Sequence, residues 1–206
     1  MGTPKDSEKT RAKLIEAAGR LFAERGYTAV TVREIISRAD THLSAMNYHF
    51  GSKEELYKAV VEEACMPDMI TDSERAALQK MKPEQALRVM ITETEKDYRK
   101  KQGSQWRSKL LARESRDPSP AFEEASEIHY KPQAAFLAEL IGAVAGKAPD
   151  DMQVRLAVLL LWAMFDSVFE YSHLVETVAP GLLAYLEEEK RFADGLYDLV
   201  IHVAGK

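Results

Sequence analysis

The stretch from Thr31 to Lys53, TVREIISRADTHLSAMNYHFGSK, constrains this chain most, because its residues specify two short helices separated by a tight turn. Thr31 followed by Glu34 is a capping box, in which each side chain can bond the backbone N–H of the other residue and so define a helix start. Apolar residues then recur at helical spacing as far as Ala39, so one face of this helix is predicted to be buried. Asp40 and the threonine after it interrupt the pattern and predict the turn. The stretch is therefore typical of a helix-turn-helix.

A second short helix is predicted from about His42 to Tyr48. Leu43 and Met46 lie three residues apart and are expected to pack inward, which leaves the polar residues of this helix on or near its outer face. Short polar side chains such as Ser and Asn can hydrogen-bond base edges, and Asn suits adenine. We therefore expect this helix to lie in the major groove of DNA.

The next helix begins at a second capping box, formed by Ser52 and Glu55. The unsatisfied N–H groups at its start can face a nearby phosphate. His49 and Lys53 flank the second helix, and both can reach phosphates as well. The predicted contacts to bases and phosphates are Thr31, Arg33, His42, Ser44, Asn47, Tyr48, His49 and Lys53.

Residues of this stretch fit a T-[VT]-x-x-I helix, a short turn and a pattern like L-Y-x-[HY]-F-x-[SN]-K-x-x-L. The residues aligned with this pattern are Thr31, Val32, Ile35, Met46, Asn47, Tyr48, His49, Phe50, Ser52, Lys53 and Leu56. In this pattern, over roughly residues 9 to 60, the chain resembles TetR-type transcriptional regulators. The resemblance implies an all-α fold, in which a three-helix DNA-binding head is followed by a helical ligand-binding and dimerisation domain. It also implies a homodimer that acts most often as a repressor.

Four positions depart from the pattern of the family. Asp40 stands where the turn Gly is usual, although Asp tolerates a left-handed backbone better than most residues. His42 occupies the cap position of the second helix, where Ser or Asn would be better. Thr41 replaces a common buried Val, and Asn47 replaces a frequent Tyr that touches phosphate in the family. These departures bear on the tilt and the base contacts of the second helix, not on the fold.

Beyond the helix-turn-helix the sequence predicts helix after helix, with no alternating pattern typical of strands. Pro67 ends the helix that starts at Ser52, so a domain boundary is predicted there. We expect a DNA-binding domain over 7–66, with a linker helix over 52–66, and an effector-binding and dimerisation domain over 67–206. The expected helices are at about 7–25, 31–39, 42–48, 52–66, 73–80, 83–101, 105–116, 119–145, 151–175 and 187–203.

The last two predicted helices carry more apolar surface than one small domain needs. Residues 151–175 contain LAVLLLWAMFDSVFEY, which is apolar nearly all round, so this helix is expected to be buried on more than one side. Residues 187–203 carry apolar residues along one face. We therefore expect a homodimer in which these two helices form a four-helix bundle. A two-fold dimer would also place two reading helices on two half-sites of double-stranded operator DNA.

The middle helices hold aromatic and charged residues that could line a pocket for a small-molecule effector, as the resemblance implies. Plain core packing is the more common role for any single aromatic residue, whereas a buried charge usually has a partner. The sequence does not identify the effector. The candidate effector-binding residues are Tyr98, Trp106, Arg107, Arg113, His129, Trp162, Phe165, Asp166, Phe169 and His173.

Composition limits the possible function classes. A single cysteine, Cys65, excludes a disulfide within the chain and fits a reducing cytoplasm. The five histidines have no zinc-ligand spacing, and the sequence has no Gly-rich phosphate loop, G-x-S-x-G or H-E-x-x-H, so we expect no metal, no cofactor and no enzyme. The most apolar run, Leu156 to Phe165, is too short to span a bilayer, so we expect no membrane partner.

The net charge of −5 by itself argues against a nucleic-acid partner. Residues 1–58, however, hold ten Lys and Arg and eight Asp and Glu, a balance of +2, so the remainder carries −7. This asymmetry favours DNA contact through the N-terminal end only. The sequence therefore predicts a DNA-binding transcriptional regulator, a repressor released from a palindromic operator by a small molecule. The acidic overall balance leaves open an alternative, a helical ligand-binding or adaptor protein without sequence-specific DNA binding.

Overall fold

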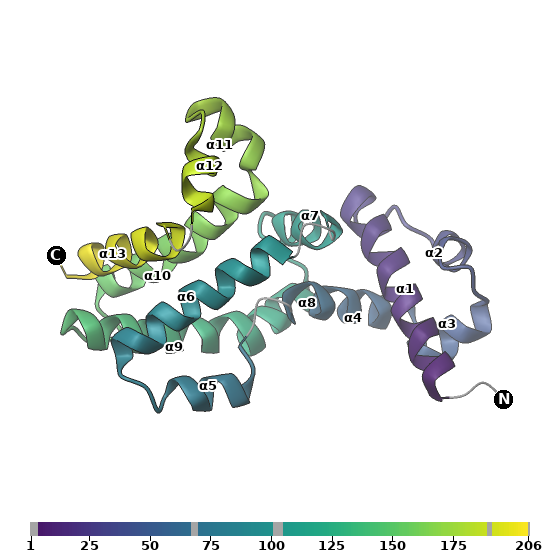
Figure 1. The fold of residues 1–206 in the computed structure, drawn as a ribbon. Coiled ribbons are helices and arrows are strands. Elements are labelled where there is room, and N and C mark those ends of the chain that lie inside the picture. The colour runs from purple at the N-terminus through teal and green to yellow at the C-terminus, as the bar shows by residue number, and fades with distance from the viewer. Residues whose placement is uncertain (1–3, 67–69, 101–104, 189–190, 206) are drawn as a thin grey trace. The chain divides into compact units, whose positions relative to one another are not determined.

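The computed structural model describes residues 4–66, 70–100, 105–188 and 191–205, and within these ranges the chain forms helices and no strand (Figure 1). The all-α fold class is therefore confirmed. The chain divides into two compact units. The head unit comprises residues 1–69 and 104–130, and the body unit comprises residues 70–103 and 131–206.

The head unit contains the helix-turn-helix and three later elements that pack against it. Leu14 and Phe22 of the first helix, Ile35 of the second and Leu56 of the fourth are fully buried in its core. Gly26 follows the first helix with φ +78°, a left-handed backbone that suits Gly. The elements are α1 (Pro4–Arg25), α2 (Val32–Arg38), α3 (Leu43–His49), α4 (Lys53–Cys65), α7 (Gln105–Glu114), α8 (Pro120–Ala125) and the π-helical turn η2 (Ser126–Tyr130).

Helix α7 lies against both α1 and α4, and α8 lies against α4. The ring of Trp106 covers Gly19 of α1 so closely that a Cβ at that glycine would come within 2.5 Å of it. The indole N–H of Trp106 also donates to the Glu16 carboxylate, 2.8 Å away. These contacts place residues 105–130 with the head, whereas the sequence assigned them to the 67–206 domain. The expected boundary at Pro67 lies outside the described residues.

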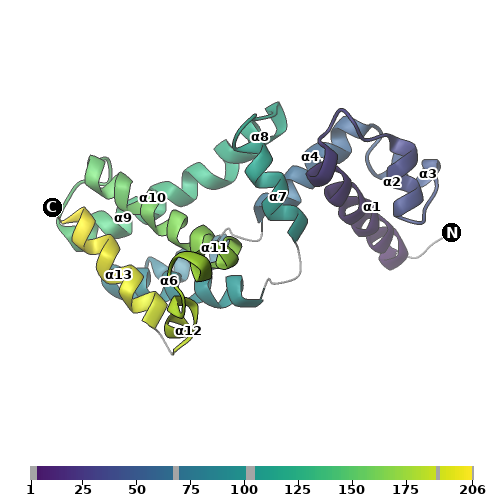
Figure 2. The same cartoon turned by 90° about the horizontal axis from the view of Figure 1, so that it is seen from above.

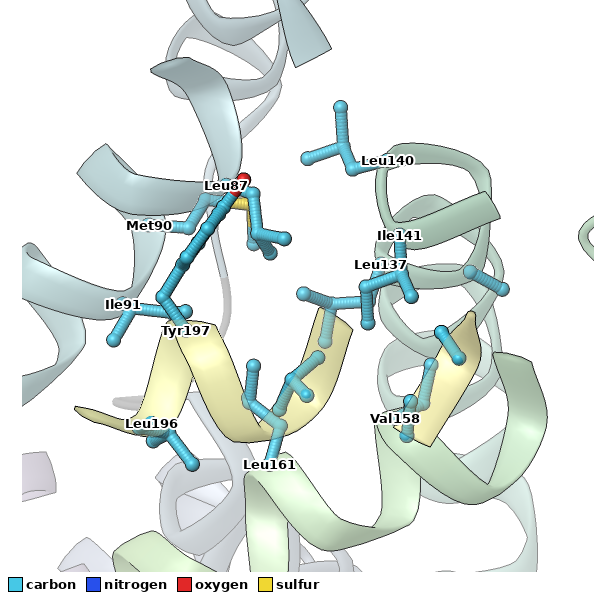
Figure 3. Close-up of a cluster of buried hydrophobic side chains, with 14 of the residues drawn as sticks. Leu87, Met90, Ile91, Leu137, Leu140, Ile141, Val158, Leu161, Leu196 and Tyr197 are labelled. Atoms are coloured by element: carbon cyan, nitrogen blue, oxygen red, sulfur yellow. The ribbon is translucent and has the colours of Figure 1, made fainter. Parts of the chain in front are cut away.

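The core of the body unit is formed by four helices that lie side by side in both Figures 1 and 2. These helices are α6 (Pro83–Lys100), α9 (Lys131–Ala145), α10 (Met152–Phe165) and α13 (Arg191–Ala204). Figure 3 shows apolar side chains from all four helices meeting, among them Leu87, Ile141, Leu161 and Leu196. Each such side chain contributes about 1.5–3 kcal/mol when it is fully buried. The remaining elements are α5 (Asp72–Leu78), the π-helical turn η3 (Asp166–Glu170), α11 (Ser172–Val178) and α12 (Leu182–Glu187).

Three expected helices differ from those in the structure. The run predicted over 119–145 is divided into α8, η2 and α9, and the run predicted over 151–175 is divided into α10, η3 and α11, with a break at Tyr171. A π-helical turn admits one extra residue, and a helix that is apolar nearly all round gives no sequence sign of that change of phase. The last helix is described from Arg191 onward, and Leu182–Glu187, after Gly181 with φ +82°, form the separate α12.

One side of α10 is not covered by the described residues of the body unit. Val158 and Leu161 are buried in the body core, but Met152 and Leu159 are 75% and 60% exposed. The prediction that this helix is buried on more than one side is therefore not met within a single chain. Residues 152–169 also have the length and mean hydropathy, 1.5, of a membrane span, but 33% of them are buried in the body. Core helices satisfy the same criterion, so this helix does not indicate a membrane protein.

Candidate nucleic-acid interface

The start of α2 has the predicted capping box. The Thr31 hydroxyl accepts the Glu34 N–H at 3.3 Å, and the Thr31 N–H donates to the Glu34 carboxylate at 2.8 Å. Hydrogen bonds from the side chain and backbone of Thr31, and then from Arg25, lower the pKa of Glu34 to about 2. The carboxylate therefore stays charged at the positive end of the helix dipole, where it stabilises α2.

In the turn between α2 and α3, Asp40 and His42 have the conformations expected from the sequence. Asp40 has φ +49°, so an aspartate holds the left-handed position that Gly usually takes in the family. His42 is the N-cap of α3, and its side chain makes no cap hydrogen bond in the described structure. Helix α3 therefore lacks the side-chain cap that α2 and α4 have.

Helix α3 presents a different outer face from the predicted one. Met46 is buried, as expected, but Leu43 is 52% exposed, so the prediction that it packs inward is wrong. Leu43 is the first residue of α3, and its side chain leaves the core at the end of the turn. Together with Ser44, Asn47 and Tyr48, which is 80% exposed, it forms the outer face of the helix. The spacing of these four residues, at i, i+1, i+4 and i+5, is the signal that could have identified that face.

The start of α4 follows the end of α3 after three residues. The Ser52 hydroxyl accepts the Glu55 N–H at 3.1 Å, but the Ser52 N–H donates to the Phe50 carbonyl, so only half of the second predicted capping box forms. The Lys53 ammonium lies 4.2 Å from the centre of the Tyr27 ring. The pKa of this lysine is lowered, because the effect of partial burial exceeds the opposite effect of the nearby Glu34 carboxylate. His49, like Lys53, is half-buried at the edge of the interface.

Arg33 lies on α2, not on the reading helix. Its side chain is exposed and lines an open depression of about 510 Å³ between α1 and α2. Arg25 and Arg38 line the same depression, and each pairs with a glutamate, Glu34 at 2.8 Å and Glu24 at 3.9 Å. All eight predicted DNA contacts therefore lie in the head unit, on α2, α3, the start of α4 or the residues that cap them.

The structure does not gather the ten candidate effector residues in one place. Four of them lie in the head unit, in contact with α1, with Gly26 just after α1, or with α4. Beyond Trp106, described above, Arg107 pairs with Glu63 at 2.8 Å, and His129 lies 2.7 Å from Glu62. Arg113 lies against Gly26, where a Cβ would come within 2.6 Å of its guanidinium.

The body unit brings together most of the others. Tyr98 stacks on Phe165 with ring centres 5.3 Å apart, lies 5.4 Å from Phe169, and donates its hydroxyl to Asp166 at 3.2 Å. Trp162 is half-buried and packs against the body core. His173, by contrast, is exposed on α11. Asp166 and Phe169 belong to the π-helical turn η3, an irregularity that often occurs at functional sites.

An exposed, mixed polar and apolar face on the second of two short helices, flanked by two capped helix starts, defines a helix-turn-helix DNA-binding protein. Two family models match this chain. That of the bacterial regulatory proteins of the tetR family matches residues 14–60. That of the C-terminal domain of the HTH-type transcriptional dual regulator CecR matches residues 83–178.

Relatives support the same assignment. CecR of Shigella flexneri is 28% identical over 194 residues, which are 88% of this chain and 85% of the relative. The HTH-type transcriptional repressor AcnR of Corynebacterium glutamicum is 35% identical over 66 residues, 31% of this chain and 35% of the relative. The chain belongs to the TetR family and is a DNA-binding transcriptional regulator, not an enzyme.

Solved structures show the same fold at low sequence identity. HlyIIR, a hemolysin II transcriptional regulator, is 17% identical, with a TM-score of 0.63 over 94% of this chain and 97% of that one. A gamma-butyrolactone receptor described as an ArpA-like protein is 22% identical, with a TM-score of 0.55 over 96% of this chain and 98% of that one.

Proposed function

We propose that this regulator binds a palindromic operator in the cytoplasm as a homodimer, and that a small molecule bound in the body releases it. The observation that carries the proposal is the exposed outer face of α3 between the capped starts of α2 and α4. The proposed action is repression, which agrees with the name of the relative AcnR.

The proposed DNA contacts have two roles. Ser44, Asn47 and Tyr48 lie on the outer face of α3 and contact base edges, with Arg33 reaching in from α2. Leu43 adds an apolar contact on the same face, which suits a thymine methyl group. The phosphate contacts are Thr31, His49 and Lys53, and His42 lies at the cap between the two groups.

The homodimer is proposed to form through residues 151–175 and 187–203. Met152, Leu156 and Leu159 of α10 are exposed, and so is Leu199 of α13. Helices α10 and α13 pack against each other, so these side chains belong to one helix pair. A second copy that covers this surface would complete a four-helix bundle and remove the apolar residues from water.

The proposed effector site is the aromatic cluster of Tyr98, Phe165 and Phe169 with Asp166, together with Trp162, which packs against the same body core. Flat aromatic faces beside one carboxylate suit a largely apolar molecule with a hydrogen-bond donor. Binding there would favour a conformation in which the two heads no longer match the operator. A shift from nearly full to nearly empty occupancy needs a preference of about 10⁴-fold, or about 5.5 kcal/mol.

The test is a selection from a pool of random duplexes, followed by affinity measurements on the enriched sequences. We expect two-fold symmetric sites, and an Asn47→Ala variant that loses about 1–3 kcal/mol of discrimination at one base pair. Lys53→Ala should instead weaken binding to all duplexes alike. A wild-type protein that enriches no sequence would refute operator binding and favour the adaptor alternative.

A further inference from the structure

A buried carboxylate joins three helices of the head unit. Glu114, the last residue of α7, is only 3% exposed. One of its oxygens accepts the N–H and the hydroxyl of Ser119, the N-cap of α8, at 2.9 and 2.6 Å. The other oxygen accepts the hydroxyl of Tyr57 from α4. A buried carboxylate with these three donors holds α4, α7 and α8 in one arrangement.

The hydroxyl of Tyr57 remains a donor throughout the ordinary pH range. Burial, and then the hydrogen bond to Glu114, raise the pKa of Tyr57 well above its usual value. The loss of either partner would leave a buried polar group unpaired, which is costly. The contact therefore fixes the Tyr57 ring in position.

From Tyr57 the contacts continue to Lys53, the proposed phosphate contact. Its ring meets the rings of Phe22 and Tyr27, each with centres 4.9 Å apart. Tyr27 is partly exposed, and its ring lies beneath the ammonium of Lys53 at 4.2 Å. A continuous set of contacts thus runs from Glu114 through two rings to Lys53.

We propose that Glu114 and Tyr57 are positioning residues for DNA binding, which hold the Lys53 ammonium, through Tyr27, in place for a phosphate. The inference rests on the proposed phosphate contact of Lys53. A free lysine loses much rotamer freedom when it is ordered, so a lysine already held over a ring binds phosphate at a lower entropic cost. Glu114 lies outside residues 14–60, which the helix-turn-helix family model matches.

The test is a double-mutant cycle between Tyr57→Phe and Lys53→Ala. The probe is a fluorescein-labelled duplex selected by the wild-type protein, and its affinity is measured by anisotropy at several KCl concentrations. Lys53→Ala should lower the slope of log K against log salt by about 0.9 for each phosphate that is no longer neutralised. Tyr57→Phe should weaken binding by about five- to tenfold and lower the slope in the same direction, and it should have little further effect once Lys53 is absent.

Two more variants separate positioning from folding. Tyr197→Phe removes the hydroxyl of another buried tyrosine, but in the body unit, and should leave affinity and slope unchanged. Tyr27→Leu removes the ring beneath Lys53 from a partly exposed position, and should repeat the slope change and the non-additivity even if Tyr57→Phe fails to fold.

The outcomes distinguish this inference from the proposed function. An unchanged slope in Tyr27→Leu, or effects on affinity that simply add to that of Lys53→Ala, would overturn the positioning role while operator binding stands. A wild-type protein that binds no duplex, or a Lys53→Ala variant with the wild-type slope, would overturn the phosphate contact and the positioning role together.

Discussion

The helix-turn-helix and the run from α10 to α11 differ in how their ends are encoded. In the helix-turn-helix, a cap at Thr31, a left-handed residue at Asp40 and a cap at Ser52 define the boundaries locally. In the body, the run passes through η3 to Tyr171 with no comparable polar signal. Hydrogen-bonding side chains thus determine where a helix begins, whereas an apolar run does not show where one helix ends and the next begins.

The largest expected effect tests the uncovered apolar surface of the body. Leu159→Glu would place a charge in the proposed dimer interface, where it would lose water without gaining a partner. We expect the dimer to weaken by a factor on the order of a hundred or more, measured by sedimentation equilibrium. Ile128→Glu changes an equally exposed residue of the head unit and serves as control. Equal dimer stability in both variants would argue for a different interface.

Alanine substitutions at one glycine of each unit are expected to have the next largest effects, on the free energy of unfolding. Gly19→Ala would drive a Cβ to 2.5 Å from the Trp106 ring, and we expect it to destabilise the protein by about 1–3 kcal/mol in urea unfolding. A Cβ at Gly195 of α13 meets nothing within 4 Å. Gly195→Ala should therefore stabilise the protomer by about 0.5–1 kcal/mol, when it is compared in the Leu159→Glu background that opens the proposed dimer interface. A change of stability with the same sign in both variants would contradict the close packing of α7 against α1.

The missing side-chain cap of α3 predicts that a better N-cap residue would raise the stability of the protein. His42→Ser should stabilise the head by about 1 kcal/mol, because a serine hydroxyl at the N-cap can accept a backbone N–H that His42 leaves without a side-chain partner. The matched control is His202→Ser, the same exchange at an exposed position near the end of α13, where no such gain is expected. Chemical denaturation followed by circular dichroism measures both.

The smallest expected effect concerns the two complete capping boxes found among the described residues, at the starts of α2 in the head unit and α5 in the body unit. The pKa of Glu34 is lowered from 4.5 to about 2, so its contribution to folding is fully present above pH 4.5 and is lost as the pH falls towards 2. The stability difference between wild type and Glu34→Gln should shrink over that range. Glu74 forms a capping box with Thr71 in the body unit, and its pKa is also lowered. The stability difference between wild type and Glu74→Gln should therefore also shrink as the pH falls. A difference that does not vary with pH would refute the cap as its source.

The local features of the candidate site could be predicted from the sequence. The start of α2, the left-handed Asp40 and the uncapped His42 all depend on neighbouring residues, and the structure confirms them. The orientation of Leu43 was predicted wrongly, because the spacing to Met46 does not show that the helix starts only at that residue.

Long-range packing was not accessible from the sequence. Trp106 lies 87 positions after Gly19 along the chain. The residues next to Trp106 in the sequence do not show whether its ring packs against α1 or lines an effector pocket. The buried Glu114 is a similar case, since its partners come from α4 and α8. These contacts depend on which helices the fold brings together, which local periodicity does not contain.

The seat of Trp106 on α1 bears on how regulators of this kind can be recombined. A chimera that joins residues 1–66 to the C-terminal part of another protein would leave Gly19 facing a foreign surface instead of an indole ring. We expect such chimeras to be unstable unless they also contain residues 105–130. The unit that can be transferred between proteins is therefore discontinuous in the chain.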